Sequence, residues 1–247
     1  KIKGDLQEID QVVERLISHF ESKGAKVIIL SEYGINDVSK PVHLNRILRE
    51  AGYIALREEQ GLELLDPGAS RAFAVSDHQI AHVYCPDETV LDEVKLLLMQ
   101  TNGVKKVLSG DELVAYHIDH PRAGDLVLIA DSDAWFTYYY WLDDNKAPDF
   151  ARCVDIFKKP GYDPVEMFMD PKNPFIKLRA AYKLARKLTG FRYRMDVIPL
   201  DPTLVKGSHG SPFCDEAYYP LYIADNQPTD NMEPTEVYSL IWNTVFK

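Results

Sequence analysis

Two side chains that could bind a metal or a substrate, those of Glu32 and Tyr33, follow the apolar run Val27–Leu30 and precede Gly34. A short apolar run after a helical segment is typical of a buried parallel strand, and open α/β sheets bind ligands just beyond the carboxyl ends of such strands. A carboxylate there suits a divalent cation, and a phenol oxygen suits a metal or a substrate. The competing interpretation is a solvated glutamate beside a packing tyrosine in an ordinary loop.

A second group combines Asp77 and His78 with His82, four residues further on, in a chain with seven histidines. Carboxylate and imidazole together favour metal binding or proton transfer. If this segment were one strand, His78 and His82 would share a face and Asp77 would point the other way. The alternative is that the histidines are satisfied polar groups in a half-buried strand.

A third signal is His209, which lies between Gly207 and Gly210 in a loop rich in glycine, proline and serine. Glycines on either side let the backbone approach whatever the imidazole binds. A single histidine in such a loop is a weak motif alone, and it gains meaning beside a carboxylate at a strand end.

Cationic side chains supply candidate phosphate ligands. Arg122 could clamp an anion because a guanidinium pairs well with phosphate. Lys159 and Tyr162 could line a phosphate site by the same reasoning. The alternative for Arg122 is a surface arginine in a turn, and the alternative for Lys159 and Tyr162 is a solvated loop.

Composition narrows the function classes. The 247 residues carry a net charge of −10 and no uninterrupted block of lysine and arginine, which argues against a nucleic-acid duplex or an anionic membrane as the main partner. The three cysteines lie far apart, so neither a disulfide framework nor a thiolate zinc site is indicated, and a reducing, cytoplasmic location is expected. No apolar run approaches the length of a spanning helix.

Periodicity indicates the elements that would position these groups. Apolar residues at spacings of three and four predict a helix over residues 5–22, and a strand over 26–31 follows it. A helix near 41–52 and a hairpin over 53–65 come next. Residues 71–130 read as two short strands, a helix and two more strands, which predicts a small inserted α+β subdomain.

The second half of the chain is less regular. Residues 131–175 are dense in aromatics and then in proline and glycine, which predicts a long, ordered, functional loop. A basic amphipathic helix to about Leu188, a strand over 218–224 and a helix over 233–246 complete the order. These elements predict an α/β fold with a mixed sheet.

Two motifs, Ser31-Glu-Tyr-Gly34 and Gly207-Ser-His-Gly210, resemble those of the alkaline phosphatase superfamily, in particular its branch of type I phosphodiesterases and nucleotide pyrophosphatases. In that branch a strand ends in Ser-Asp-His-Gly, whose Asp and His bind one zinc, and a later Gly-x-His-Gly loop binds a second. The resemblance implies a mostly parallel sheet with helices on both faces and a single domain over residues 1–247. It places Glu32, Tyr33 and His209 as metal ligands.

This sequence departs from the family pattern in two ways. Glu32 and Tyr33 replace the Asp and His of the motif, so Asp77 and His78 are predicted to contribute from a neighbouring strand. The family's first metal-binding Asp, its Thr or Ser nucleophile and an Asp-x-x-x-His pair all precede the helix that opens this chain. The chain therefore resembles the carboxy-terminal part of such an enzyme, and an upstream segment or second chain is expected to complete the site.

The resemblance implies a metal-dependent hydrolase of phosphodiester or pyrophosphate bonds in a phosphate-ester small molecule. Two divalent ions are expected, with zinc first and manganese or iron as alternatives. His82, Arg122, Lys159 and Tyr162 would bind the substrate, and the aromatic run over 135–141 would shape its pocket. The alternatives are a non-catalytic binding or scaffolding member of the fold and a phosphomonoesterase, sulfatase or phosphonate hydrolase.

Overall fold

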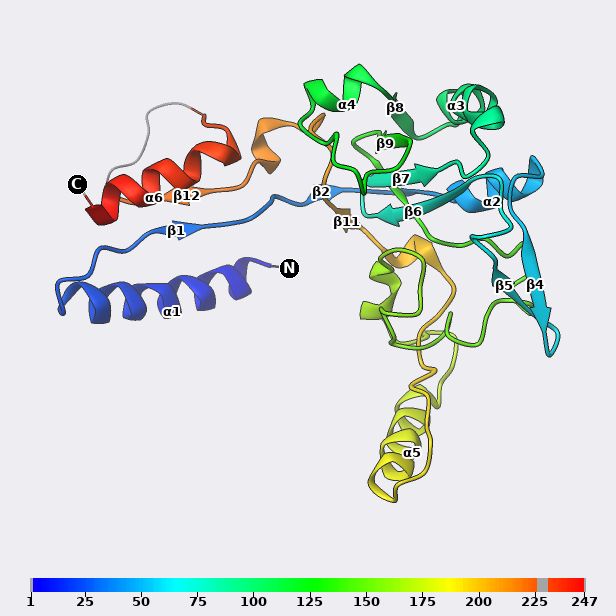
Figure 1. The fold of residues 1–247 in the computed structure, drawn as a ribbon. Coiled ribbons are helices and arrows are strands. Elements are labelled where there is room, and N and C mark those ends of the chain that lie inside the picture. The colour runs from blue at the N-terminus through cyan, green and yellow to red at the C-terminus, as the bar shows by residue number, and fades with distance from the viewer. Residues whose placement is uncertain (1, 226–230, 247) are drawn as a thin grey trace. The chain divides into compact units, whose positions relative to one another are not determined.

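The computed structural model describes residues 2–225 and 231–246, and the chain divides into two compact units (Figure 1). Unit 1 combines residues 1–34 with 217–247, and unit 2 is the continuous segment Ile35–Glu216. Both contain helices and short strands, so the predicted mixed α/β class is confirmed. The grouping of both units into one catalytic domain stays a prediction.

Unit 1 is built from helix α1 (Lys3–Glu21), helix α6 (Val237–Phe246) and one strand pair. The expected helix over residues 5–22 and the closing helix are confirmed. Strand β1 (Ile29–Leu30) is shorter than expected and pairs antiparallel with β12 (Tyr222–Ile223). The expectation of a buried parallel strand is therefore wrong for this segment, because its only described partner runs in the opposite direction and Leu30 is exposed.

The largest sheet lies in unit 2 and has the strand order β6-β7-β9-β8, with every pair antiparallel. Side chains alternate between buried and partly exposed along β6 and β7, whereas every residue of β9 is buried. Its strands fall within the predicted 71–130 segment. They are β6 (Phe73–Asp77), β7 (Ile80–Tyr84), β8 (Val104–Leu108) and β9 (Leu126–Ala130).

Two helices, α2 and α3, cover one face of this sheet. Leu44 and Leu48 of α2 and Val94 and Leu98 of α3 are fully buried in one cluster with the sheet's apolar residues. The asparagine side chain of Asn45, also in α2, makes two hydrogen bonds of 2.8 Å to the backbone of Ala74 in β6. The helices of unit 2 are α2 (Leu44–Glu50), α3 (Leu91–Met99), α4 (Asp111–Ala115) and α5 (Ile176–Leu188).

Unit 2 has three further strand pairs among its described residues: β4–β5 is a local hairpin, whereas β3–β10 and β2–β11 connect distant segments. The hairpin of β4 and β5 was predicted, whereas β2, β3, β10 and β11 were not. The remaining strands are β2 (Asn36–Asp37), β3 (Lys40–Val42), β4 (Leu56–Glu59), β5 (Leu62–Leu65), β10 (Ala134–Phe136) and β11 (Gly207–Ser208). The 3-10 helices are Glu88–Val90, Pro164–Met167, Pro202–Leu204, Glu216–Tyr218 and Pro234–Glu236.

Antiparallel pairing predominates among the described strands, and only β3 and β10 form a parallel strand pair. The predicted mostly parallel sheet is therefore wrong for these strands. Helices do pack on both faces of the largest sheet, because Leu113 of α4 clusters with Val127 and Ile129 on the face of β9 opposite to α2 and α3. The physical reason is the length of the connections: β4–β5 and β6–β7 are joined by two-residue turns, which permit only antiparallel neighbours.

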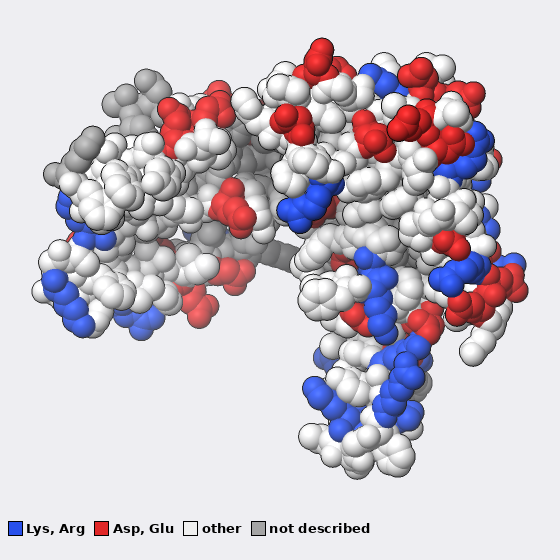
Figure 2. Space-filling model, in the orientation of Figure 1, with Lys and Arg blue, Asp and Glu red and all other residues white. Residues whose placement is uncertain are grey.

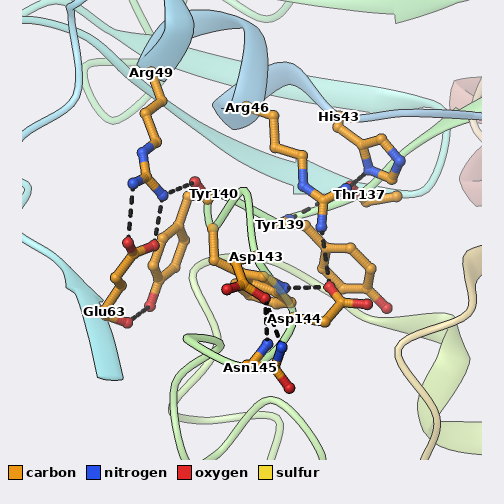
Figure 3. Close-up of polar contacts among 11 residues, drawn as sticks. His43, Arg46, Arg49, Glu63, Thr137, Tyr139, Tyr140, Asp143, Asp144 and Asn145 are labelled. Atoms are coloured by element: carbon orange, nitrogen blue, oxygen red, sulfur yellow. Dashed lines mark hydrogen bonds and ion pairs between the residues drawn. The ribbon is translucent and has the colours of Figure 1, made fainter. Parts of the chain in front are cut away.

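The aromatic run over residues 135–141 forms a core rather than a pocket wall, because every side chain in it is at most 1% exposed. Charged residues close over its later part (Figure 3). Arg49 pairs with both carboxylate oxygens of Glu63 and donates to the carbonyl of Tyr140. Trp141 donates to Asp144 at 2.9 Å. The expectation that these rings shape a substrate pocket is corrected by their burial.

Among the described residues, no helix is both long and apolar enough to cross a bilayer.

Burial of His43 above this aromatic core makes stability depend on pH. Its ring stacks on Tyr139, its Nδ1 lies 2.7 Å from the hydroxyl of Thr137, and burial, with the Arg46 cation, lowers its pKa to about 4. The unfolded chain takes up this proton near pH 6.5, whereas the folded chain takes it up only near pH 4. The folded state therefore loses stability as pH falls through that window, by about 3 kcal/mol in total.

We expect His43→Gln to remove this contribution, so that the free energy of unfolding of the variant falls less between pH 6.5 and 4 than that of the wild type. Urea unfolding at pH 7, 6, 5 and 4 measures the difference. His19→Gln, on exposed helix α1, is the control and keeps the wild-type slope. Equal slopes for His43→Gln and the wild type would contradict the assignment.

Candidate functional site

His78 occupies the two-residue turn between β6 and β7 with a φ of +55°, in the left-handed region that costs energy for residues other than glycine. Its Nδ1 lies 2.6 Å from Oδ1 of Asp77, the last residue of β6. This hydrogen bond is the main cause that lowers the pKa of Asp77, so the carboxylate stays ionised at neutral pH. The two residues therefore form an aspartate–histidine pair on a strained turn.

The His78 ring contacts two other rings. Tyr162 stacks on it with centroids 4.5 Å apart, and His209 lies 4.0 Å away with an interplanar angle of 32°. The structure thus brings together Asp77, His78, Tyr162 and His209, which were predicted as site residues from three separate segments. These four residues are called the His78 cluster below.

A close backbone approach positions Tyr162. Gly161 pairs with Ser76 of β6, and the N–H of Tyr162 donates to the Ser76 carbonyl at 2.8 Å. A Cβ on Gly161 would lie 2.5 Å from that carbonyl oxygen, and its φ of +123° also excludes most other residues. Glycine is required here because only a bare backbone lets the loop reach the sheet.

A buried glutamine positions His78 and His209. The Oε1 of Gln79 accepts from Asn36 Nδ2 at 3.2 Å and from the N–H of Ser211 at 3.3 Å. Its backbone N–H donates to the carbonyl of His209 at 3.0 Å. Its Nε2 donates to the carbonyl of Ala134 at 3.0 Å and its side chain is fully buried. One amide therefore joins the His78 turn, the His209 loop, β2 and β10.

His82 and Arg122 lie elsewhere on the sheet. His82 is in β7, after the turn at His78, so the predicted pair of short strands around Asp77 and His78 is confirmed and the two histidines do not share a strand. Its Nδ1 accepts from the N–H of Gly124 at 3.0 Å, and burial lowers its pKa, which favours the neutral ring. Arg122 is exposed on the neighbouring turn. Their roles as substrate ligands stay predictions.

Lys159 is fully buried and neutralised within the protein. Its Nζ lies 2.8 Å from Asp163 and 2.6 Å from Glu166. Burial raises the pKa of Asp163, and the Lys159 cation opposes that effect. Because the Lys159 ammonium is buried and paired with two carboxylates, it is not accessible to a phosphate group in this structure.

Glu32 and Tyr33 belong to unit 1, whereas the His78 cluster belongs to unit 2. The side chains of Glu32 and Tyr33 are exposed. A Cβ on the following residue, Gly34, would lie 1.5 Å from the carbonyl oxygen of Tyr218, so this part of the motif requires glycine for backbone contact. The assignment of Glu32 and Tyr33 as metal ligands stays a prediction.

The described residues alone do not fit the expected two-metal centre. Within residues 2–225 and 231–246, no three or more His, Cys, Asp and Glu side chains gather in a way that could hold a metal ion. The His78 cluster offers two imidazoles and a carboxylate, but that carboxylate is already bonded to one of the imidazoles. No step of the chemistry is therefore derived through a metal.

The His78 cluster can bind and transfer protons. An aspartate that accepts from Nδ1 fixes the imidazole tautomer and leaves Nε2 for an external group. Sequence reasoning found all four residues but missed Gln79 and Gly161, which hold them. Lys-Pro-Gly161-Tyr contained a turn signal, whereas nothing in the sequence distinguished Gln79 from a surface glutamine.

Comparison with known proteins adds a family match. A family model described as type I phosphodiesterase / nucleotide pyrophosphatase matches residues 1–163, a range that contains Asp77, His78 and Tyr162 and ends before His209. No relative was found among the curated protein sequences.

Two solved structures were also compared with the chain. Phosphonoacetate hydrolase from Sinorhizobium meliloti 1021, in complex with phosphonoacetate, is 20% identical over 49% of this chain and 30% of its own, with a TM-score of 0.36. Murine ectonucleotide pyrophosphatase / phosphodiesterase 5 is 18% identical over 52% of this chain and 31% of its own, also with a TM-score of 0.36. The matches thus span about a third of each of these structures.

Replacing Gln79 tests the link between the two histidines. We expect Gln79→Ala to leave the Asn36 amide and the Ser211 N–H unpaired in the interior, at a cost of about 3 kcal/mol in unfolding free energy, since each such group costs ~1–3 kcal/mol. NMR shifts of the His78 and His209 rings should also change. Gln100→Ala, at an exposed position, is the control. Unchanged stability and ring shifts in Gln79→Ala would show that the amide does not hold the cluster.

Proposed function

Because this chain belongs to the type I phosphodiesterase / nucleotide pyrophosphatase family, whose model matches well over half of its residues, we propose that it forms part of a metal-dependent hydrolase of phosphodiester or pyrophosphate bonds. The substrate proposed is a small-molecule phosphate ester. Support comes from the family match and from the His78 cluster, which brings proton-transfer groups from three segments of unit 2 together around one turn.

The observation that carries the proposal is the Asp77–His78 pair beside His209. Hydrolysis at phosphorus requires a proton at the leaving oxygen and compensation for the charge that develops there. With Nδ1 held by Asp77, His78 can present Nε2 to that oxygen, and His209 supplies a second imidazole 4.0 Å away between ring centroids. Tyr162 stacks on the His78 ring and limits its rotation.

The family resemblance also implies divalent ions, zinc first, with manganese or iron as alternatives. In our proposal His209 and His78 would contribute to their binding, and the assignment of Glu32 and Tyr33 of unit 1 as metal ligands stays a separate prediction. The nucleophile and the remaining ligands are proposed to lie on an upstream segment or a second chain, because the family's nucleophile precedes the motif that Ser31–Gly34 resembles.

The second candidate is a non-catalytic binding or scaffolding member of the family. The substitution of Asp-His by Glu32-Tyr33 favours it, because tyrosine is an uncommon metal ligand. Metal content and activity of the complete protein distinguish the two candidates.

We expect the complete protein to bind divalent metal and to cleave bis(p-nitrophenyl) phosphate. His78→Ala and His209→Ala should each lower the rate about 100-fold or more, which is a typical loss for a proton-transfer group. Elemental analysis and initial rates measure both effects, and His19→Ala, on the exposed face of α1, is the control.

Three outcomes separate the hypotheses. A wild type without metal or activity would favour the non-catalytic member. If the wild type is active and both histidine variants keep its metal content and rate, the His78 cluster is not part of the active site. Lost rate with unchanged metal content would restrict the two histidines to proton transfer.

A further inference from the structure

Helix α5 and the residues around it reverse the charge of the rest of the chain. Residues 172–194 contain eight Lys and Arg and no Asp or Glu. The segment therefore carries +8 in a chain of −10, so the remaining residues carry −18. Figure 2 shows the consequence: the lobe that contains α5 is coloured mainly blue and white, whereas red atoms are common over the sheet.

The polar side of α5 faces its own chain. Lys183 and Arg179 both pair with Asp196 on the returning segment, Lys183 at 2.8 Å. Arg194 pairs with Asp149, which fastens the base of the same loop. Lys183, Arg186, Ile176 and Ala180 are the partly buried positions of the helix. These contacts fix which side of the helix faces outward.

The outward side of α5 is apolar. Leu178, Tyr182 and Leu188 are 68%, 58% and 87% exposed, and no residue of the helix is buried. Phe175 before the helix and Phe191 after it are 69% and 65% exposed. In Figure 1 the helix stands away from the sheet of unit 2. An amphipathic helix normally buries its apolar side, so this one requires a partner.

We propose that α5 docks on an anionic phospholipid surface, with its apolar side among the acyl chains and its cations at the headgroups. Helices that lie in the membrane interface combine a strong apolar face with lysine and arginine on the other. Lys177, Arg186, Lys187 and Arg192 have no ion-pair partner among the described residues and are available to anionic headgroups. A shallow groove beside the apolar side is lined by Asn173, Phe175, Leu178, Arg179 and Tyr182.

Charge also sets the orientation of docking. The remainder of the chain, at −18, is repelled by an anionic surface, so only the α5 lobe can approach it. A second copy of residues 172–194 would bring eight cations against eight, which disfavours pairing of two copies through this segment. A nucleic acid would use the cations but would leave the exposed leucines and phenylalanines in water.

Sedimentation with phospholipid vesicles tests the proposal independently of any hydrolase activity. The full chain is mixed with vesicles of phosphatidylcholine alone or with one quarter phosphatidylglycerol, at 0.1 and 0.5 M salt. We expect binding to the anionic vesicles at low salt, at least 10-fold weaker binding to neutral ones, and a loss of affinity at high salt.

Two variants separate charge from apolar contact. Lys177→Glu/Arg186→Glu/Lys187→Glu and Leu178→Ser/Leu184→Ser/Leu188→Ser should each weaken vesicle binding at least 10-fold while the circular dichroism spectrum is retained, because these positions are mostly exposed. The control, Lys3→Glu/Lys23→Glu/Lys105→Glu, makes the same change in net charge at exposed sites outside α5 and should bind like the wild type.

Several results would overturn the proposal. The first is a wild type that does not bind anionic vesicles. The second is a control variant that loses as much binding as the α5 variants, and the third is unchanged binding in both α5 variants. Gel filtration that shows a dimer dispersed by the leucine variant, without vesicle binding, would assign the apolar side to a second copy. Salt-sensitive binding to RNA that exceeds binding to vesicles would assign the cations to nucleic acid.

Discussion

The arrangement of unit 2 depends on a buried amide, the side chain of Gln79. An amide in the interior must satisfy both its donor and its acceptor, because each unpaired group costs ~1–3 kcal/mol. Here the partners come from β2, from the segment before β10 and from the loop after β11. These segments are far apart in the sequence, so the requirement of one side chain fixes their relative positions.

The same constraint explains the strained turn at His78. Its carbonyl accepts from the N–H of Phe136 at 2.7 Å, and the next residue is Gln79, so both sides of the turn are held. A left-handed conformation persists only where its surroundings over-determine it. The strain places the imidazole against Tyr162 and His209, which is the arrangement on which the proposed hydrolase chemistry depends.

Charge must be considered region by region in this protein. The net charge of −10 indicates a partner other than an anionic surface, whereas residues 172–194 carry only cations. The structure adds which of these cations are engaged, since Arg179 and Lys183 face Asp196. It also shows that the apolar side of α5 faces outward, which periodicity alone could not decide, because an amphipathic pattern has the same form whichever side is covered.

Local rules determined much of the chain. The α/β class, α1, the β4–β5 hairpin, α3 and α5 follow from apolar spacing and turn residues, which act over a few positions. The family followed from two short motifs. Burial of the aromatic run was missed because aromatic side chains serve cores and pockets alike, and only packing separates the two.

Tertiary structure decided what the motifs could not. Asp77, His78 and His209 were identifiable from residue type, but their meeting depends on Gln79 and Gly161, whose partners lie up to 132 residues away. The pairing direction of the strands, the burial of Lys159 between two carboxylates and the outward side of α5 are likewise long-range outcomes. Sequence spacing specifies which groups can react, whereas the pairing of buried polar groups across the fold decides which of them meet.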